Sequence, residues 1–132
     1  IVSYKDGYFL DTGSPHVVKF VKDVEKMDVI TEGKRIRHHT DFPQGTNVNF
    51  VEIKENYLFV RTFERGVEDE TLSCGTGVTA SALAYSLIHP VSEVEVKTLG
   101  GQLKVTFQRQ NNAFKHVFLQ GPTCFVFEGY LP

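Results

Sequence analysis

Alternating apolar and polar positions predict a chain of short strands joined by turns. From Asn47 the sequence NVNFVEI alternates with a period of two, turns at Glu55-Asn56 and then alternates again, which is typical of a β-hairpin. Glycine, proline, aspartate and asparagine separate the other apolar runs in the same way. The expected strands are residues 1–4, 8–11, 16–21, 47–53, 57–63, 93–98, 102–108, 116–120 and 125–130.

Two segments do not alternate and predict helices. Residues 28–39 combine a thin apolar face of Val29, Ile30 and Ile36 with basic residues near the end, which favours a surface helix. Residues 75–88, GTGVTASALAYSLI, carry no charge and are small or apolar on every face, so this helix must be buried on all sides. The expected fold class is α+β, with a strongly bent antiparallel sheet wrapped around one central helix.

Composition and charge exclude several classes of protein. A chain of 132 residues with 41% hydrophobic and 23% charged residues fits one ordered domain rather than a disordered segment. The net charge of −2, without a basic stripe, gives no reason to expect nucleic acid or a membrane surface as a partner. No apolar run approaches the roughly 18 residues of a membrane span, and no leader opens the chain, so we expect a cytoplasmic location.

The two cysteines, Cys74 and Cys124, do not suggest a disulfide framework, which usually contains more cysteines. Cys124 lies in the apolar run TCFVF, where a structural role in a strand is expected. The chain also begins at Ile1, directly in strand-like sequence. This start is what a fragment of a longer protein would show.

The sequence SCGTG places Cys74 at the start of the apolar helix, where backbone N–H groups lack partners and attract anions. Gly75 and Gly77 allow a ligand carboxylate to approach the backbone, and Thr76 adds a hydroxyl donor. A thiol beside a carboxylate pocket suits removal of a proton from the carbon next to a carboxylate. The alternative interpretation is a buried cysteine that only packs among small residues.

Acidic residues near this helix start influence the expected state of the thiol. A helix N-terminus stabilises a thiolate by only ~0.3–1 kcal/mol. The nearby carboxylates would oppose ionisation if they lay close, so we expect Cys74 to rest mainly as the neutral thiol; they are Glu64, Glu68, Asp69 and Glu70. His38-His39 is expected to be a solvated helix end, and no metal site or cofactor is expected.

Several motifs resemble one enzyme family. The run ERGVEDETLSCGTG resembles the second-cysteine signature of diaminopimelate epimerases, and TGSPHVV, GTNVNFVEI and GPTCFVFEG resemble other segments of that family in the same order. The resemblance covers essentially all 132 residues. It implies an isomerase that converts LL-diaminopimelate to meso-diaminopimelate in lysine and cell-wall precursor biosynthesis, independently of pyridoxal phosphate or any other cofactor.

The resemblance also implies roles for individual residues. Cys74 would be the second of two catalytic cysteines, Glu64 would support its proton exchange, and His16 would reach towards the other half-site. The substrate-binding residues would be Ser14, Asn47, Glu64, Arg65, Gly75 and Thr76.

The sequence departs from the family pattern in three ways. Ser14 stands where the family often has asparagine, and the loop between Glu64 and Cys74 is one residue longer than in many members, so the role of Glu64 requires that loop to bulge outward. Family members have a preceding domain with the first cysteine, and residues 1–132 contain no counterpart of it. Residues 1–132 would then form the C-terminal domain of a two-domain epimerase, inactive alone, whose unpaired last strand favours a homodimer or a displaced strand.

Two alternatives remain open at the level of sequence. One is a related enzyme of the same fold, proline racemase-like or phenazine-biosynthesis-like, against which the ERG segment and the position of Cys74 count. The other is a ligand-binding domain without chemistry. That alternative predicts that Cys74→Ser leaves turnover of the complete protein intact.

Overall fold

The computed structural model describes residues 1–132 and contains one nine-stranded sheet with two α-helices and a short 3-10 helix. The strands run in the order β1-β2-β3-β4-β5-β7-β8-β9, and β6 pairs with β5 outside this path. The strands are β1 (Val2–Tyr4), β2 (Gly7–Asp11), β3 (Pro15–Phe20), β4 (Asn47–Ile53), β5 (Leu58–Glu64), β6 (Asp69–Thr71), β7 (Glu93–Thr98), β8 (Gly101–Gln110) and β9 (Ala113–Gln120). The helices are η1 (Val24–Lys26), α1 (Val29–Arg37) and α2 (Gly75–Ile88).

The expected α+β class, with a curled sheet around one helix, is confirmed, but the expectation of a purely antiparallel sheet is wrong. β3 pairs with β4 in parallel, and β5 pairs with β7 in parallel, whereas the other pairings are antiparallel. The physical reason lies in the connections. Each parallel pair is joined through a helix, α1 or α2, and parallel neighbours require such a crossover.

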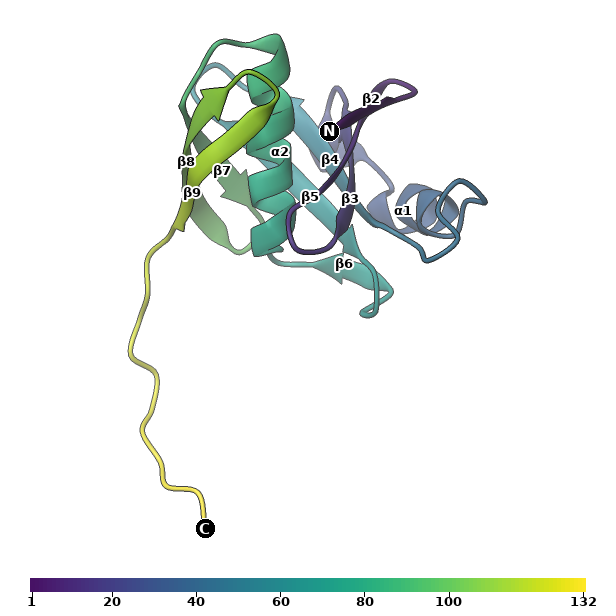
Figure 1. The fold of residues 1–132 in the computed structure, drawn as a ribbon. Coiled ribbons are helices and arrows are strands. Elements are labelled where there is room, and N and C mark those ends of the chain that lie inside the picture. Colours follow the sequence, from purple (N-terminus) through teal and green to yellow (C-terminus); the bar gives the residue numbers. More distant parts are fainter.

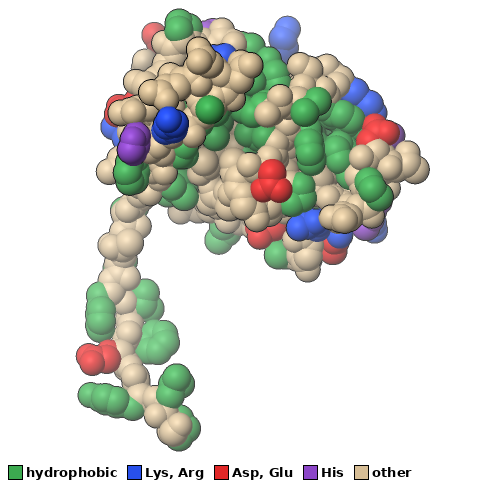
Figure 2. All heavy atoms as spheres, in the orientation of Figure 1, with side chains coloured by type: hydrophobic (Ala, Val, Ile, Leu, Met, Phe, Trp, Pro, Cys, Tyr) green, Lys and Arg blue, Asp and Glu red, His purple; other side chains and the backbone are tan.

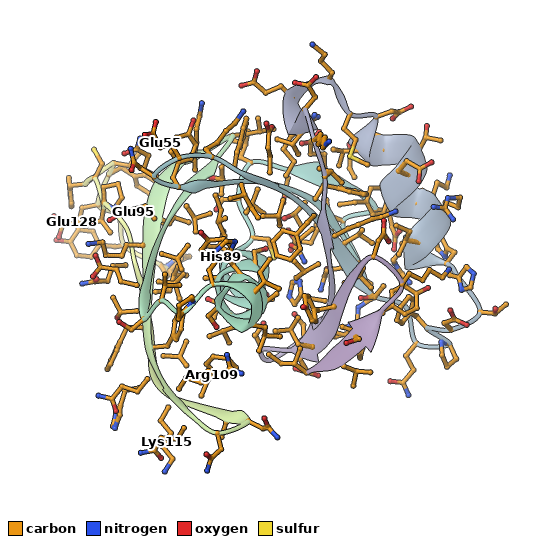
Figure 3. The ribbon with its side chains drawn as sticks, turned by 90° about the horizontal axis from the view of Figure 1, so that it is seen from above. Glu55, His89, Glu95, Arg109, Lys115 and Glu128 are labelled. Atoms are coloured by element: carbon orange, nitrogen blue, oxygen red, sulfur yellow. The ribbon has the colours of Figure 1, made fainter.

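The sheet curls around α2, which Figure 3 shows nearly end-on inside the ring of strands, with α1 outside it. The predicted bounds of this helix, residues 75–88, are confirmed, and Val78, Ala80, Ala82 and Ala84 are inaccessible to solvent. Small side chains allow the strands to approach the helix closely. Enclosure is nevertheless incomplete, because a cavity of about 520 Å³ opens beside α2 between β2 and β9.

The outer face of the sheet carries α1 and a second apolar core. Val29 and Ile36 are buried there as predicted, but Ile30 is 41% exposed. Gly33 takes the third place on the buried face, because a Cβ at that position would overlap the ring of Phe63. Neither helix is long and apolar enough to cross a membrane.

The far end of α2 is held by a side chain from the sheet. Arg109 of β8 donates from Nη1 to the carbonyl oxygen of Ser86 in the last turn, at 3.1 Å, and Figure 3 shows it beside the helix. A cation at this end is favoured because the last carbonyls of a helix lack partners. The guanidinium of Arg109 therefore caps the last turn of the apolar helix. The first turn of α2 meets the polar residues described in the next subsection.

The predicted last strand is wrong. Residues 121–132 form no strand and extend away from the body, with apolar side chains along their length (Figures 1 and 2). Phe125, Phe127 and Tyr130 are at least 80% exposed, and the thiol of Cys124 is exposed instead of packed in a strand. A segment of high strand propensity becomes a strand only beside a partner strand, and no strand of the sheet pairs with it.

The loop after β5 contains structure that the sequence did not reveal. Residues 65–68 turn the chain, and β6 pairs back onto β5 with Glu64 opposite Asp69. Two of its acidic residues face arginines: Glu68 accepts from Arg37 at 2.7 Å, and Glu70 pairs with Arg61 at 2.6 Å. The sequence did not indicate that Glu68 and Glu70 are each paired with an arginine. The expected neutral state of the Cys74 thiol stays a prediction.

Arg61 is a structural centre of the outer face, because it binds Glu70 through two nitrogen atoms and also donates to three backbone carbonyls at 2.7–3.2 Å around η1. Arg61→Met should lower the free energy of unfolding by about 3–5 kcal/mol, because it leaves a half-buried carboxylate without its partner. Urea unfolding monitored by circular dichroism measures this loss. The matched control is Arg35→Met, which removes an exposed pair with Glu32 and should cost no more than about 1 kcal/mol; equal losses in both variants would contradict the prediction.

Candidate functional site at the start of the central helix

Cys74 is the N-cap residue of α2, in extended conformation with φ −124° and ψ 107°, as expected from its place in the sequence. Its carbonyl oxygen accepts from the N–H of Val78 at 2.8 Å, and its side chain makes no capping hydrogen bond. Sγ lies 3.6 Å from the hydroxyl oxygen of Thr76, and the residue is 8% exposed. The thiol therefore lies at the opening of the helix, within reach of the first helical turn.

A polar group on the concave face of the sheet meets this opening. Its members occupy the same alternate positions as apolar residues that pack on α2: His16 of β3, Asn47 and Asn49 of β4, and Thr62 of β5. All four are at most 4% exposed, and no buried side-chain nitrogen or oxygen lacks a hydrogen-bond partner. Such burial is tolerated because every polar atom is paired.

The imidazole of His16 connects β3 to α2. Nε2 lies 2.9 Å from the hydroxyl oxygen of Thr76 and 3.0 Å from that of Ser14, and the two hydroxyl oxygens lie 3.2 Å apart. Thr12 adds a hydrogen bond from its hydroxyl to the carbonyl oxygen of Thr76 at 2.8 Å. The loop before β3 and the first turn of α2 thus share one hydrogen-bonded group that includes the neighbour of Cys74.

Burial decides the charge of this histidine. Loss of hydration lowers the pKa of His16 to about 4, against an opposing contribution from the carboxylate of Asp11. His16 is therefore neutral at pH 7. It contributes hydrogen bonds rather than a positive charge to the site.

Asn49 lies on the other side of the imidazole. Its Nδ2 is 3.0 Å from Nδ1 of His16 and donates to the carbonyl oxygen of Val17 at 3.0 Å. Its Oδ1 accepts from the hydroxyl of Thr62 at 2.9 Å. The sequence motifs did not indicate Asn49 and Thr62 as site residues. The available signal was a polar residue at a core-facing position of an otherwise apolar strand.

Asn47 and Arg65, both expected to bind the substrate, contact each other in the structure. Asn47 donates to the carbonyl oxygen of Pro15 at 3.0 Å, and its Oδ1 accepts the backbone N–H of Arg65 at 2.8 Å. The guanidinium of Arg65 donates to the carbonyl oxygen of Gln44 at 3.0 Å. It also lines a cavity of about 660 Å³ that contains Asp11 and aromatic side chains; Cys74 does not line it.

Glu64 and Gly75 complete the set of predicted site residues. The carboxylate of Glu64 accepts from the hydroxyl of Thr71 at 2.9 Å and makes no other side-chain hydrogen bond. Gly75 begins α2 and faces the side chain of Leu119 from β9. The structure therefore brings Ser14, His16, Asn47, Cys74 and Thr76 into one polar group, with Arg65 attached through its backbone and Glu64 bound to β6.

No cluster of three or more histidine, cysteine, aspartate or glutamate side chains is arranged to hold a metal ion. His38 lies 3.6 Å from Glu68 and His39 lies 3.1 Å from Asp41, both at the exposed end of α1. Cys74 and Cys124 are both free thiols. The residues at the start of α2 supply a thiol, an imidazole, hydroxyls and helix amides.

Solved structures show which class this fold defines. A predicted epimerase from Pseudomonas aeruginosa aligns with a TM-score of 0.59 at 14% identity, covering 78% of this chain and 36% of that protein. A putative phenazine biosynthesis PhzC/PhzF protein from Clostridium difficile aligns with a TM-score of 0.56 at 21% identity, covering 77% and 36%. At these identities the likeness establishes the fold alone, an α+β domain shared by epimerase-like and phenazine-biosynthesis proteins.

Sequence similarity identifies the family within that class. The family model for diaminopimelate epimerase matches residues 8–126, and the chain belongs to this family. Diaminopimelate epimerase from Flavobacterium psychrophilum is 45% identical over 96% of this chain and 52% of its own length. The enzyme of the same name from Aquifex aeolicus is 48% identical over 95% and 46%. The chain thus spans about half the length of the curated relatives it matches.

The depressed pKa of His16 predicts a pH-dependent stability. Between the unfolded value near 6.5 and the folded value of about 4, the unfolded chain binds a proton that the folded chain does not, so the free energy of unfolding falls as pH falls. His16 should account for a loss of about 2 kcal/mol between pH 7 and pH 5. Urea unfolding of the wild type and of His16→Gln at both pH values measures it; equal pH dependence in the two proteins would contradict the prediction.

Gly77 provides a test of the close packing at the helix start. A Cβ at this position would overlap Oδ1 of Asn49 and lie 3.3 Å from Sγ of Cys74. Gly77→Ala should therefore lower the free energy of unfolding by about 1–3 kcal/mol, although alanine favours helices. The matched control is Gly75→Ala, which meets only the end of the Leu119 side chain, at 3.0 Å, and should be tolerated. Thermal unfolding of both variants decides, and a stabilised Gly77→Ala protein would contradict the prediction.

Proposed function

We propose that this chain supplies one of the two acid/base thiols of a diaminopimelate epimerase, which interconverts LL- and meso-diaminopimelate. Membership of the family supports this proposal, as do relatives of that name at 45–48% identity. The observation that carries it is the position of Cys74 at the opening of a buried helix, 3.6 Å from the hydroxyl of Thr76. The proposed reaction is an isomerisation of an amino acid without a cofactor.

In the proposed mechanism the first amides of α2 bind the carboxylate next to the reacting carbon, since amides at this end of a helix lack partners inside the helix. Gly75 and Thr76 would contribute these amides. In one direction the thiolate of Cys74 takes the proton from the α-carbon on one face, while a thiol on the opposite face returns a proton. Each turnover removes one proton and returns one, so no net proton is gained or lost. In the reverse direction the two thiols exchange roles.

The remaining polar residues would hold the other end of the substrate. Asn47 and Arg65 already form one unit, and Arg65 faces a cavity that also contains Asp11. A guanidinium and a carboxylate in one cavity suit a distal group that carries both an ammonium and a carboxylate. Ser14 would contact the substrate, and the buried His16 would act towards the other half-site through its hydrogen bonds to Ser14 and Thr76. Glu64 would support proton exchange at Cys74 on the strength of its motif.

We further propose that the chain is inactive alone. It contributes one suitable thiol, because Cys124 lies in the exposed segment after β9, and inversion by two bases needs a thiol on each face. The chain spans about half of its relatives, which agrees with a second domain that would supply the other thiol and the other half of the pocket. A homodimer through the exposed terminal segment stays a prediction of the sequence.

The alternatives make different predictions. A phenazine-biosynthesis-type or proline-racemase-like isomerase would act on another substrate, and the likeness to phenazine proteins extends only to the fold. A ligand-binding domain without chemistry would not depend on the thiol. One experiment distinguishes the proposed epimerase from a proline-racemase-like isomerase and from a ligand-binding domain, because the substrate and the cysteine can be varied independently.

The experiment joins this chain to the part of the Flavobacterium psychrophilum relative that it does not match, and follows the exchange of the substrate α-proton in D₂O by NMR. The joined protein should exchange and epimerise diaminopimelate but not proline, whereas the 132-residue chain should do neither. Cys74→Ser should lower the rate by about 10²–10⁴, the usual contribution of a general acid or base.

The control for this series is Cys124→Ser, which changes an exposed thiol in the terminal segment and should keep the activity. Unchanged turnover in Cys74→Ser would support a protein whose chemistry does not use this thiol. Turnover of proline in place of diaminopimelate would support the racemase alternative. Activity of the chain alone would contradict the requirement for a second domain.

A further inference from the structure

Asn49 is a fully buried polar residue to which the sequence motifs assign no role. It lies on β4 between the imidazole of His16 and the first turn of α2, where the absence of a side chain at Gly77 leaves room for its Oδ1. Its side-chain nitrogen and oxygen both have partners, at 2.9–3.0 Å. A residue so completely bound has one orientation.

That orientation follows from the groups it meets. The carbonyl oxygen of Val17 can only accept, so the atom facing it at 3.0 Å must be the NH₂ group of Asn49. The other amide atom, Oδ1, then accepts the hydroxyl hydrogen of Thr62 at 2.9 Å. Rotating the amide by half a turn would set two oxygens against each other at Val17, which leaves a buried acceptor unpaired.

The orientation of the Asn49 amide in turn determines the tautomer of the His16 imidazole. The second hydrogen of the NH₂ group faces Nδ1 of His16 at 3.0 Å, so Nδ1 must accept and the proton of the neutral ring lies on Nε2. Nε2–H then donates towards the hydroxyl oxygens of Thr76 and Ser14, at 2.9 and 3.0 Å. In this tautomer His16 cannot take a proton from Thr76.

We propose that Asn49 is a positioning residue that fixes His16 as the Nε2–H tautomer and thereby directs hydrogen bonds from Thr62 through the amide and imidazole to Thr76 and Cys74. Because Thr76 accepts from His16, its own hydrogen is available for Sγ of Cys74 at 3.6 Å. The sulfur is then the acceptor at the end of the chain. The importance of this arrangement for turnover rests on the proposed function, but the tautomer itself does not.

The first test is an NMR measurement on the 132-residue chain with ¹⁵N-labelled histidine at pH 7. Wild-type His16 should show a protonated Nε2 and an unprotonated Nδ1. Asn49→Asp places an acceptor opposite Nδ1 and should shift the proton to Nδ1, whether the ring becomes the other tautomer or the imidazolium. A wild-type ring protonated at Nδ1 would overturn the proposal without any variant.

Two further variants keep the proposal testable if Asn49→Asp does not fold. Asn49→Ala removes the amide without adding a charge and should give ¹⁵N shifts averaged between tautomers. Asn47→Asp makes the same chemical change two positions away on β4, where the side chain binds Pro15 and Ser14 rather than the imidazole, and should leave Nδ1 unprotonated. Folded Asn49→Ala protein with wild-type His16 shifts would overturn the proposal, since Asn49 would then only link β3 to β4.

The second test follows the sulfur. In a Cys124→Ser background only Cys74 reacts with iodoacetamide, so the alkylation rate at pH 7 reports on this thiol. Asn49→Ala should lower the rate by about threefold to tenfold, the effect of losing about one hydrogen bond to the sulfur. An unchanged rate would overturn the link from Asn49 to Cys74. Neither test involves turnover, so failure of the proposed epimerase activity would be seen separately in the exchange experiment.

Discussion

The burial of α2 inside a curled sheet is the constraint on which the rest of the structure depends. The helix has no charged residue, so water cannot solvate any face of it favourably, and the strands must close around it. An enclosed helix still has unpaired amides at its first turn. These amides, with Cys74 beside them, form a candidate binding site because the surrounding strands bring several polar side chains to this end of the helix, whereas its middle turns meet apolar side chains and Arg109 binds its last turn.

The strands contribute side chains to two apolar cores, one on each face of the sheet. The outer face contains structural ion pairs, and the inner face contains the polar group of the candidate site. Alternate residues of β3, β4 and β5 pack outward on α1 or inward on α2. Arginine–carboxylate pairs lie at the outer face, where Arg61 binds Glu70 and the carbonyls around η1. The inner polar group contains neutral donors and acceptors instead. Its central histidine is neutral because desolvation outweighs the nearby Asp11.

The enclosure is open on one side, where the cavity between β2 and β9 reaches Thr79 and Leu83 of α2. The terminal segment leaves the body on β9 with its apolar side chains in water, and β9 ends beside the first residue of the helix through Leu119. Neighbouring exposed aromatic side chains such as Phe125, Phe127 and Tyr130 are unusual on the surface of a soluble monomer and often mark a contact site. The second domain proposed above from the length of the relatives would lie beside the open side of the pocket.

Sequence alone determined the bounds of α2, the hairpin of β4 and β5, the position of Cys74 and the family, because periodicity and local motifs depend on near neighbours in the chain. It did not determine the two parallel pairings, the β6 strand or the absence of a strand at residues 125–130, since each depends on which distant partner is available. The pairing of Glu70 with Arg61, and the place of Asn49 behind His16, were likewise decided only by the tertiary structure. A side chain's partner across a sheet is fixed by register and curvature, and these arise from the packing of the whole chain around one buried helix.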